Sequence, residues 1–419
     1  MQVARGRRDR RTRVSTMSEG GDLLLVGVGV MGRPYIDAAR RLGLRVRVVE
    51  RASRADETRV LVDDLQLTRG PLEEQWAEAA AAAAWAHRPD GVVAFSESQV
   101  MAAALVQDQL GLPGPSLRAA VVSRNKALQR AVCGARGIRQ PEYLVTPNLI
   151  DAQGWAAPRF PVVLKPLSAA GSEGVELVRG AEEFAAAAAR RAADGPLLVE
   201  TAVNGPEYSW EALVDDGEVW FANLSAKDTT GPPYFVETAG RTGIKLPGPV
   251  GVAVDRFCRA VIDAIGVRSG LVHLEFNLPG GLPTLIEIAV RTPGDHLMDL
   301  LGMTYDVDWF ELVLRLAMRI PLPSRPSGGG RWAASLWLAP EPGTIISVDG
   351  LDEVRRHPDV VRAEVSARVG DVVPPVRSSA DRVGHVVMAA GTAADRDAVL
   401  EFVRSTLQVR TTPREPERG

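Results

Sequence analysis

Short apolar runs alternate with amphipathic or alanine-rich segments over the first part of the chain. Leu23–Val26, Arg45–Glu50 and Gly91–Phe95 each have the pattern of a buried strand, because they are short, rich in aliphatic residues and followed by turn residues. Helices are expected between them, as in the alanine-rich run from Glu73 to Ala86. This alternation predicts a small parallel sheet in an α/β, Rossmann-like domain over residues 22–115, which ends at a Pro/Gly-rich turn.

The rest of the chain mixes hairpins with helices. One continuous helix is expected from Ser116 to Gly137. The segment from Lys227 to Pro249 is irregular and rich in Gly, Pro and Thr, so it is a candidate loop that covers a site. Pro321–Gly330 has the composition of a linker, and an α+β unit is expected over residues 331–410.

Composition limits the class of partner. Hydrophobic residues make up 46% of the chain and the formal net charge is -3, so no bulk attraction to nucleic acid or to a membrane is expected. No apolar run approaches the ~20 residues of a spanning helix. Cys133 and Cys258 are too few for a disulfide framework. We expect a soluble, cytoplasmic protein with buried, inert thiols. Its arginine-rich residues 1–21 are expected to be a disordered tail, or sequence upstream of the mature protein if translation begins at Met17.

Lys165 ends an apolar strand and is followed by the Gly/Ser-rich loop Ala169–Gly174. A mobile loop with exposed backbone N–H groups beside a fixed ammonium suits a polyphosphate. Lysine is scarce in this arginine-rich chain, which favours a role for a compact, mobile charge. The lysines are Lys126, Lys165, Lys227 and Lys245. The alternative for this segment alone is a surface β-hairpin with a glycine turn.

Two acidic residues stand in neighbouring strands of a predicted hairpin. If the strands pair about Gly281, Glu275 lies opposite Glu287 on one face, with Ala289 and Arg291 on the same face. Opposed carboxylates repel, so a cation should hold them together. Oxygen ligands without His or Cys favour Mg²⁺ completed by substrate phosphates. The alternative is a charged hairpin that faces solvent.

Two further motifs carry weaker signals. Glu200–Val203 ends a buried strand, where free backbone groups can contact the edge of a base, and Glu207 can accept from ribose hydroxyls. Gly27–Gly32, with Glu50 after the next strand, matches the dinucleotide-binding fingerprint. Such a turn also serves tight strand–helix packing alone, so both interpretations stay open.

The order of these features resembles the ATP-grasp superfamily, most of all its carboxylate–amine ligase branch, which includes the L-amino acid (dipeptide) ligases. The likeness runs from about Leu23 to Val409, with the most specific motifs between Lys126 and Arg291. It implies an ATP-grasp fold with mixed α/β and α+β content. Its parts would be a Rossmann-like pre-ATP-grasp domain (22–115), a two-lobed ATP-grasp catalytic unit (116–325, small lobe about 140–200) and a small α+β C-terminal domain (331–410). Such a first domain would explain Gly27–Gly32 without a nicotinamide cofactor.

The resemblance also implies roles for individual residues. ATP would be bound by Lys126, Lys165, Ser172, Gly174, Glu200, Thr201, Val203 and Glu207. Mg²⁺, for which Mn²⁺ could substitute, would be bound by Glu275 and Glu287, and the catalytic residues would be Lys165 and Arg291. The candidates for binding substrate are Lys227, Arg241, His273 and Arg291. Many relatives carry Asn where this chain has Ala289, which leaves open whether one or two metal ions bind.

The implied activity is that of an ATP- and Mg-dependent ligase that joins a carboxylate to an amine through an acyl phosphate. Its substrates would be an amino acid and another amino acid or amine in specialised metabolism. Nucleic acid and membranes are not expected partners, and a homodimer is compatible with this interpretation. The alternatives are a carboxylase-like ATP-grasp ligase, a nicotinamide-dependent oxidoreductase and a non-catalytic nucleotide-binding protein.

Overall fold

The computed structural model describes residues 20–29 and 31–413. The tail expected at residues 1–21 lies outside these residues up to residue 19. Among the described residues, no helix has the length and apolar character that crossing a membrane requires. Both cysteines are buried and carry free thiols, as predicted.

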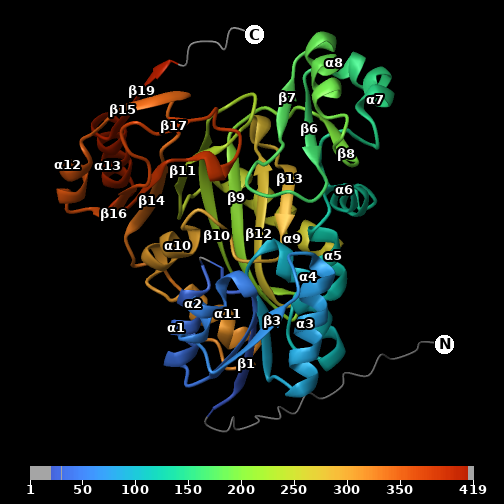
Figure 1. Ribbon diagram of the computed structural model, residues 1–419, viewed down its shortest axis with the longest axis vertical. Coiled ribbons are helices and arrows are strands. Elements are labelled where there is room, and N and C mark those ends of the chain that lie inside the picture. The colour runs from blue at the N-terminus through green and yellow to red at the C-terminus, as the bar shows by residue number, and fades with distance from the viewer. Residues whose placement is uncertain (1–19, 30, 414–419) are drawn as a thin grey trace.

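The N-terminal unit is a four-stranded parallel sheet with helices on both faces (blue in Figure 1). Its elements are β1 (Asp22–Val26), α1 (Arg33–Arg41), β2 (Arg45–Arg51), α2 (Ala55–Arg59), β3 (Asp64–Thr68), α3 (Glu73–Ala86), β4 (Gly91–Ala94) and α4 (Val100–Leu110). The strand order is β3-β2-β1-β4. Leu23 and Leu25 pack with α1, whereas Leu24 and Val26 pack with α3 and α4. The predicted parallel sheet is therefore confirmed, and β1 and β4 are mainly apolar because helices cover both faces there, whereas the edge strand β3 is largely exposed.

Two short helices follow, and the prediction of one helix from Ser116 to Gly137 is wrong. They are α5 (Leu117–Ser123) and α6 (Lys126–Gly134). Asn125 has an extended backbone, and its side chain accepts a hydrogen bond from the Leu128 N–H at 3.1 Å. Asn125 therefore caps a new helix, which places Lys126 at its first position.

The small lobe is an antiparallel sheet in the order β5-β8-β6-β7, with two helices packed on it (upper right in Figure 1). Its elements are β5 (Tyr143–Thr146), α7 (Leu149–Ala156), β6 (Val162–Pro166), β7 (Glu176–Val178), α8 (Ala181–Arg190) and β8 (Leu197–Thr201). Leu164 and Val199 lie in the apolar cluster beneath the helices, together with Phe184 of α8. The lobe therefore has its own small core.

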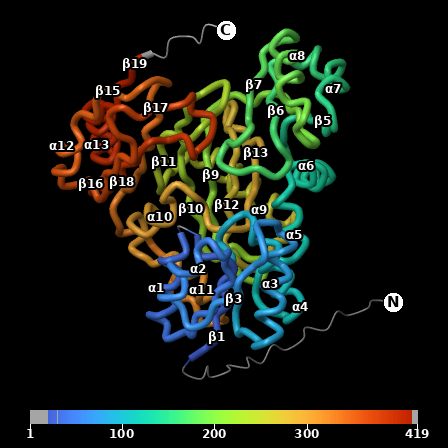
Figure 2. Tube along the Cα trace, viewed as in Figure 1, coloured from blue at the N-terminus to red at the C-terminus, as the bar shows by residue number. Residues whose placement is uncertain are grey.

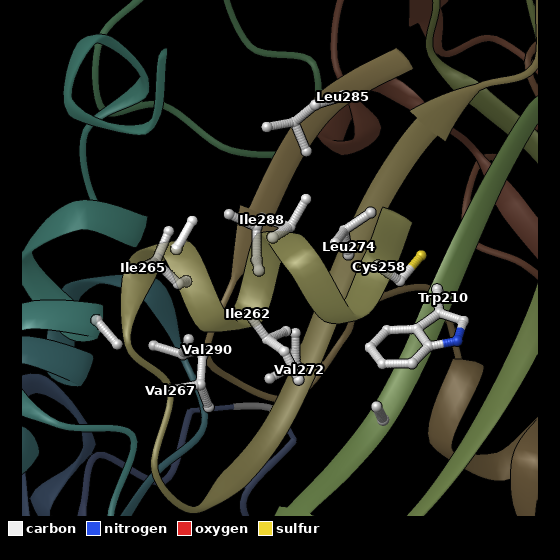
Figure 3. Close-up of a cluster of buried hydrophobic side chains, with 14 of the residues drawn as sticks. Trp210, Cys258, Ile262, Ile265, Val267, Val272, Leu274, Leu285, Ile288 and Val290 are labelled. Atoms are coloured by element: carbon white, nitrogen blue, oxygen red, sulfur yellow. The ribbon is translucent and has the colours of Figure 1, made fainter. Parts of the chain in front are cut away.

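The centre of the molecule is the first part of an eight-stranded sheet, β13-β12-β9-β10-β11-β14-β18-β16. Its first elements are β9 (Glu207–Asp215), β10 (Glu218–Thr229), β11 (Glu237–Arg241), α9 (Gly248–Ile265), β12 (Gly270–Asn277), β13 (Thr284–Ala289), α10 (Leu297–Tyr305) and α11 (Trp309–Ala317). In the core that Figure 3 shows, Cys258 and Ile262 of α9 pack on Leu274 and Ile288 of the hairpin. These apolar residues alternate with polar ones along each strand, so the opposite face of the hairpin is free to carry polar side chains.

The C-terminal region extends the same sheet. Its elements are β14 (Trp332–Trp337), β15 (Gly343–Asp349), α12 (Leu351–Arg356), β16 (Val360–Val365), β17 (Val372–Val373), β18 (Gly384–Ala390), α13 (Ala393–Thr406) and β19 (Gln408–Pro413). Strand β14 pairs with β11, with Ala239 opposite Leu336, so no gap separates the two sets of strands. The proposed boundaries of this domain stay a prediction. Figure 2 shows the C-terminal region and the small lobe on either side of the central strands, with the N-terminal unit at the other end.

The segment from Lys227 to Pro249 is more regular than predicted. It contains β11, which pairs with β10 on one side and β14 on the other. The sequence Glu237–Arg241 includes Ala and Gly and lacks the alternation typical of a strand. It forms a strand because two distant partners supply its hydrogen bonds, a long-range effect that overrides local propensity.

Candidate active site

A cavity of about 430 Å³ lies between β6 and β8 of the small lobe and β10, β12 and β13 of the central sheet. Three of the four lysines line it, namely Lys126, Lys165 and Lys227, whereas Lys245 is exposed outside it. Most of the predicted site residues line it too. They are Ser172, Glu200, Thr201, Val203, Glu207, His273, Glu275, Glu287 and Arg291. The structure therefore gathers polar residues that are far apart in the sequence.

The acidic hairpin has the predicted register. Glu275 lies directly opposite Glu287, and His273 lies opposite Ala289. Glu287 accepts a hydrogen bond from Lys126 Nζ at 2.9 Å, and Glu275 accepts one from Lys227 Nζ. Each carboxylate is thus held by a separate lysine. The alternative of a hairpin facing solvent is wrong, because both acids line the cavity.

These two carboxylates fit Mg²⁺. Among the described residues, no cluster of three His, Cys, Asp or Glu side chains is arranged to hold a metal ion by itself. Magnesium keeps several waters and is commonly bound by one or two carboxylates plus substrate phosphates. Ala289 lines the cavity beside them but offers no ligand atom. Glu275 and Glu287 would therefore hold Mg²⁺ together with waters and substrate phosphate oxygens.

Lys165 is held in place by a buried ion pair with Glu200. Its Nζ lies 2.9 Å from Glu200 Oε2, and Arg130 Nε donates to the other oxygen of the same carboxylate. Burial alone would raise the pKa of Glu200, but Arg130 and Lys165 outweigh it and lower the pKa to about 2. Glu200 therefore serves to hold two cations, and its side chain is not free to contact adenine.

The strand end beyond Glu200 is partly occupied. The Thr201 N–H donates to the Glu142 carbonyl at 3.0 Å, and the Thr201 hydroxyl accepts from the Glu142 N–H at 3.1 Å. Because the Thr201 N–H and hydroxyl already bond to Glu142, the structure does not support the predicted contact between Thr201 and a base. Among the described residues, no hydrogen bond uses the Val203 N–H, and Val203 lines the cavity, so its contact with the base edge stays a prediction.

Lys227 lies at the centre of a cluster of acids. Besides Glu275, its Nζ lies 2.9 Å from Glu237 and 3.6 Å from Glu207. Burial and the nearby Asp295 raise the pKa of Glu237 to about 7, although Lys227 opposes this. Burial, with Lys227 opposing it, likewise raises the pKa of Glu207. The sequence pattern does not predict Glu237 as a site residue, because the segment around it lacks the alternation of a strand.

His273 is held in its charged form between two carboxylates. Its Nδ1 lies 3.1 Å from Glu211 and its Nε2 lies 3.2 Å from Glu275. Burial would lower the pKa of His273, but these two hydrogen bonds raise it to about 9. The predicted shared face of His273 and Glu275 is confirmed. Glu211 was missed, although it is the one acidic residue within the apolar run Ser209–Val214 of its strand.

The glycine-rich loop contacts three other parts of the chain. Lys126 Nζ donates to the Ala169 carbonyl at 2.7 Å, and Ser172 Oγ donates to the Phe235 carbonyl at 3.2 Å. The Ser379 N–H of the C-terminal region donates to the Gly171 carbonyl at 2.9 Å. Gly174 has φ +69°, and a Cβ on it would come within 2.7 Å of Pro166, so glycine is required there. The predicted phosphate contacts of Ser172 and Gly174 remain predictions.

The two predicted substrate arginines have different places. Arg291 lines the cavity, with its Nε donating to Glu97 at 2.6 Å. Arg241 does not line it and instead pairs with Asp228. Gly240 faces the cavity, and neighbouring residues of a strand point to opposite faces, so Arg241 points away. The structure therefore does not support Arg241 as a substrate-binding residue.

The Gly27–Gly32 turn binds its own acidic residue. The N–H groups of Val28 and Gly29 donate to Glu50 Oε2 at 2.8 and 3.1 Å. A Cβ on Gly32 would come within 2.3 Å of the Val28 carbonyl oxygen. Glu50 thus accepts hydrogen bonds from the glycine turn, and it would have to give them up to bind a ribose. The glycines allow the backbone of the turn to pack closely. This arrangement opposes a nicotinamide cofactor.

Three family models match separate parts of the chain. An ATP-grasp N-terminal domain matches residues 36–114, an ATP-grasp domain matches residues 158–299, and the L-amino acid ligase C-terminal domain 2 matches residues 336–412. The matches follow the order expected from the sequence. They cover the N-terminal unit, the site and the C-terminal strands.

Similar proteins agree with these models. An uncharacterised protein y4rH of Sinorhizobium fredii is 27% identical over 404 residues, covering 90% of this chain and 80% of that protein. Carnosine synthase 1 of Gallus gallus is 30% identical over 362 residues, covering 78% of this chain but 38% of that longer protein. A crystal structure of an L-amino acid ligase from Bacillus licheniformis has a TM-score of 0.78 at 21% identity, covering 95% and 100% of the two chains. With its fold, its site and these matches, the chain belongs to the ATP-grasp superfamily and, within it, to the carboxylate–amine ligases that use ATP and Mg²⁺.

Proposed function

We propose that this protein joins the carboxylate of an amino acid to the amine of another amino acid or small molecule, through an acyl phosphate. The observation that carries the proposal is the pair Glu275 and Glu287, which face each other inside the cavity that Lys126 and Lys165 also line. Similarity to an L-amino acid ligase and to carnosine synthase 1 supports amino acids as the substrate class.

The reaction needs two steps because a free carboxylate does not react with an amine at neutral pH. In the first step, a carboxylate oxygen attacks the γ-phosphorus of ATP, the bond from that phosphorus to the β,γ-bridging oxygen breaks, and ADP leaves. In the second step, the amine nitrogen attacks the acyl carbon, the bond to the phosphate oxygen breaks, and the nitrogen loses a proton to the solvent. Phosphorylation thus replaces a poor leaving group with phosphate.

The residues of the cavity mainly position and neutralise charge, as in other phosphoryl transfers. Lys126 and Lys165 would bind phosphate oxygens, and Glu275 and Glu287 would hold Mg²⁺. A bound Mg²⁺ would stabilise the negative charge that develops on the transferred group. The loop Ala169–Gly174, which contacts Phe235 and Ser379, would exclude water that could hydrolyse the acyl phosphate.

A substrate panel with mass detection of products tests the proposal. The purified protein is mixed with ATP, Mg²⁺ and pairs of amino acids and amines, with Glu287→Gln as the inactive control. We expect an amide product and one ADP for each bond formed. A separate arm with bicarbonate tests a carboxylase-like ligase. Metal-dependent ATP binding without any product would favour a nucleotide-binding protein, and absence of ATP binding would contradict the proposal.

A further inference from the structure

Glu97, in the N-terminal unit, contacts Arg291, which lines the cavity. It begins a short 3₁₀ helix (η2, Glu97–Gln99) that follows β4. Such loops at the carboxyl ends of parallel strands are where α/β sheets place functional side chains. Glu97 Oε1 accepts a hydrogen bond from Arg291 Nε at 2.6 Å. The two residues are separated by 194 positions in the chain, so only the fold brings them together.

Arg291 has two of its three guanidinium nitrogens occupied by the protein. Its Nε bonds to Glu97, and its Nη1 donates to the Thr292 carbonyl at 2.7 Å. Among the described residues, no hydrogen bond uses Nη2. Two fixed nitrogens set the plane of a guanidinium, because the group is rigid and flat. Arg291 therefore lines the cavity in one orientation, with Nη2 left for a ligand.

Glu97 is itself held in place. Its second oxygen accepts from Arg124 Nη1 at 2.5 Å, and Arg124 is held on its other edge by Glu73. Burial disfavours the charged form of Glu97, but Arg291 and Arg124 outweigh it and lower the pKa of the carboxyl. The carboxylate is therefore ionised, and rotating it away from Arg291 would also break its hydrogen bond from Arg124.

We propose that Glu97 is a positioning residue, which orients Arg291 so that Nη2 meets the phosphoryl group being transferred in the cavity. This inference rests on the proposed function. A flexible arginine would lose rotamer freedom each time it bound the reacting group, whereas an arginine held by Glu97 has lost it in advance. The N-terminal unit thus contributes to catalysis through Arg291 without touching the substrate.

Binding of a phosphoryl-transfer mimic tests the proposal without knowledge of the substrate. The affinity for Mg-ADP is measured by calorimetry with and without aluminium fluoride, which imitates the transferring phosphoryl group. The variants are Glu97→Gln, Arg291→Ala and the double variant with both changes. The matched control is Glu73→Gln, which loosens Arg124 from its outer edge and does not contact Arg291. Thermal unfolding reports whether each variant folds.

In the wild type we expect aluminium fluoride to tighten binding of Mg-ADP. Glu97→Gln should lose about tenfold or more of that gain, with the affinity for Mg-ADP alone within about twofold of wild type. Glu73→Gln should keep the gain. The double variant should lose no more than Arg291→Ala, because a residue that acts only through Arg291 has no effect once Arg291 is gone.

Three results with Glu97→Gln would overturn the inference. Glu97→Gln could keep the full gain, it could weaken Mg-ADP and the mimic equally, or its loss could add to that of Arg291→Ala. A wild type that binds Mg-ADP but gains nothing from aluminium fluoride would also remove the role of Arg291. A wild type that does not bind Mg-ADP would overturn the proposed function itself, and the inference with it.

Discussion

Replacing Glu200 by glutamine should destabilise the protein strongly, because one buried carboxylate holds two buried cations. The Glu200 side chain is 1% exposed, and those of Arg130 and Lys165 are 0% and 9% exposed. Removing one partner of a buried ion pair leaves an uncompensated charge and costs about 3–5 kcal/mol. In Glu200→Gln this penalty falls on both cations, so we expect a loss of unfolding free energy in that range.

The acid–base behaviour of Glu200 gives an independent magnitude. Its pKa is about 2 in the folded protein, against an ordinary value of 4.5. At ~1.4 kcal/mol for each pKa unit, this difference corresponds to about 3 kcal/mol. Because the folded pKa is the lower one, the stabilisation is present above pH 4.5 and is lost as the pH falls through about 2. The ion-pair penalty and the magnitude from the pKa difference agree, so the expected loss of unfolding free energy depends on an ionised Glu200.

Urea unfolding of wild type and variant at neutral pH and at about pH 3 measures both quantities. The matched control is Glu142→Gln, whose partner Arg159 lies 2.9 Å away but whose side chain is 69% exposed. Exposed pairs contribute about 0–1 kcal/mol, so the control should unfold close to wild type. By about pH 3 more than half of the difference between wild type and Glu200→Gln should disappear. A loss at neutral pH below about 1 kcal/mol, or a loss that does not change with pH, would refute the reasoning.

Three further predictions concern the cavity. Glu287→Gln should abolish turnover, whereas its thermal unfolding should stay near that of wild type because the hairpin has its own core. Near-normal phosphate release by this variant would show that the metal assignment is wrong. Lys165→Met should weaken ATP binding more than amino-acid binding, as titration calorimetry can measure, and equal losses would contradict a phosphate contact. Glu237, with its pKa raised to about 7, binds a proton more tightly when folded, so stability should fall as pH rises from 4.5 through 7. Glu237→Gln should remove that slope in urea unfolding, and an unchanged slope would exclude Glu237 as its source.

The hairpin shows what the sequence can predict about the site. Alternation within each strand and a turn centred on Gly281 leave few registers, and both conditions are local. The pairing of Glu275 with Glu287 and the position of His273 on their face were therefore predictable. The scarcity of lysine indicated a common role for several lysines, and three of them do line one cavity.

The partners of these residues were not predictable, because the fold brings them from distant segments. Glu97 and Arg130 each neutralise or hold a site residue at least 70 positions away. Neither stands in a motif, and each would be an ordinary helix or loop residue by pattern alone. The same limit applies to β11, whose neighbours β10 and β14 determine its structure. The break at Asn125, by contrast, has a local signal in the sequence, since Asn is a preferred helix cap.

The ion pairs of the cavity suggest how it could accommodate Mg-ATP, which combines a divalent cation with negatively charged phosphates. Lys126 holds Glu287, and Lys227 holds Glu275, so neither of these two proposed metal ligands lacks a counter-ion. On binding Mg-ATP, Lys126 would exchange Glu287 for phosphate oxygens, and both carboxylates would exchange an ammonium for a divalent cation. Lys227 would keep Glu237 and Glu207 as partners. Every charge would then keep a partner, which matters because an unpaired buried charge costs several kcal/mol, on the order of the stability of the whole protein. Lys126 could therefore neutralise Glu287 before the nucleotide binds and contact phosphate afterwards, which gives a physical reason for lysine, with its mobile point charge, at this position in a chain that otherwise uses arginine.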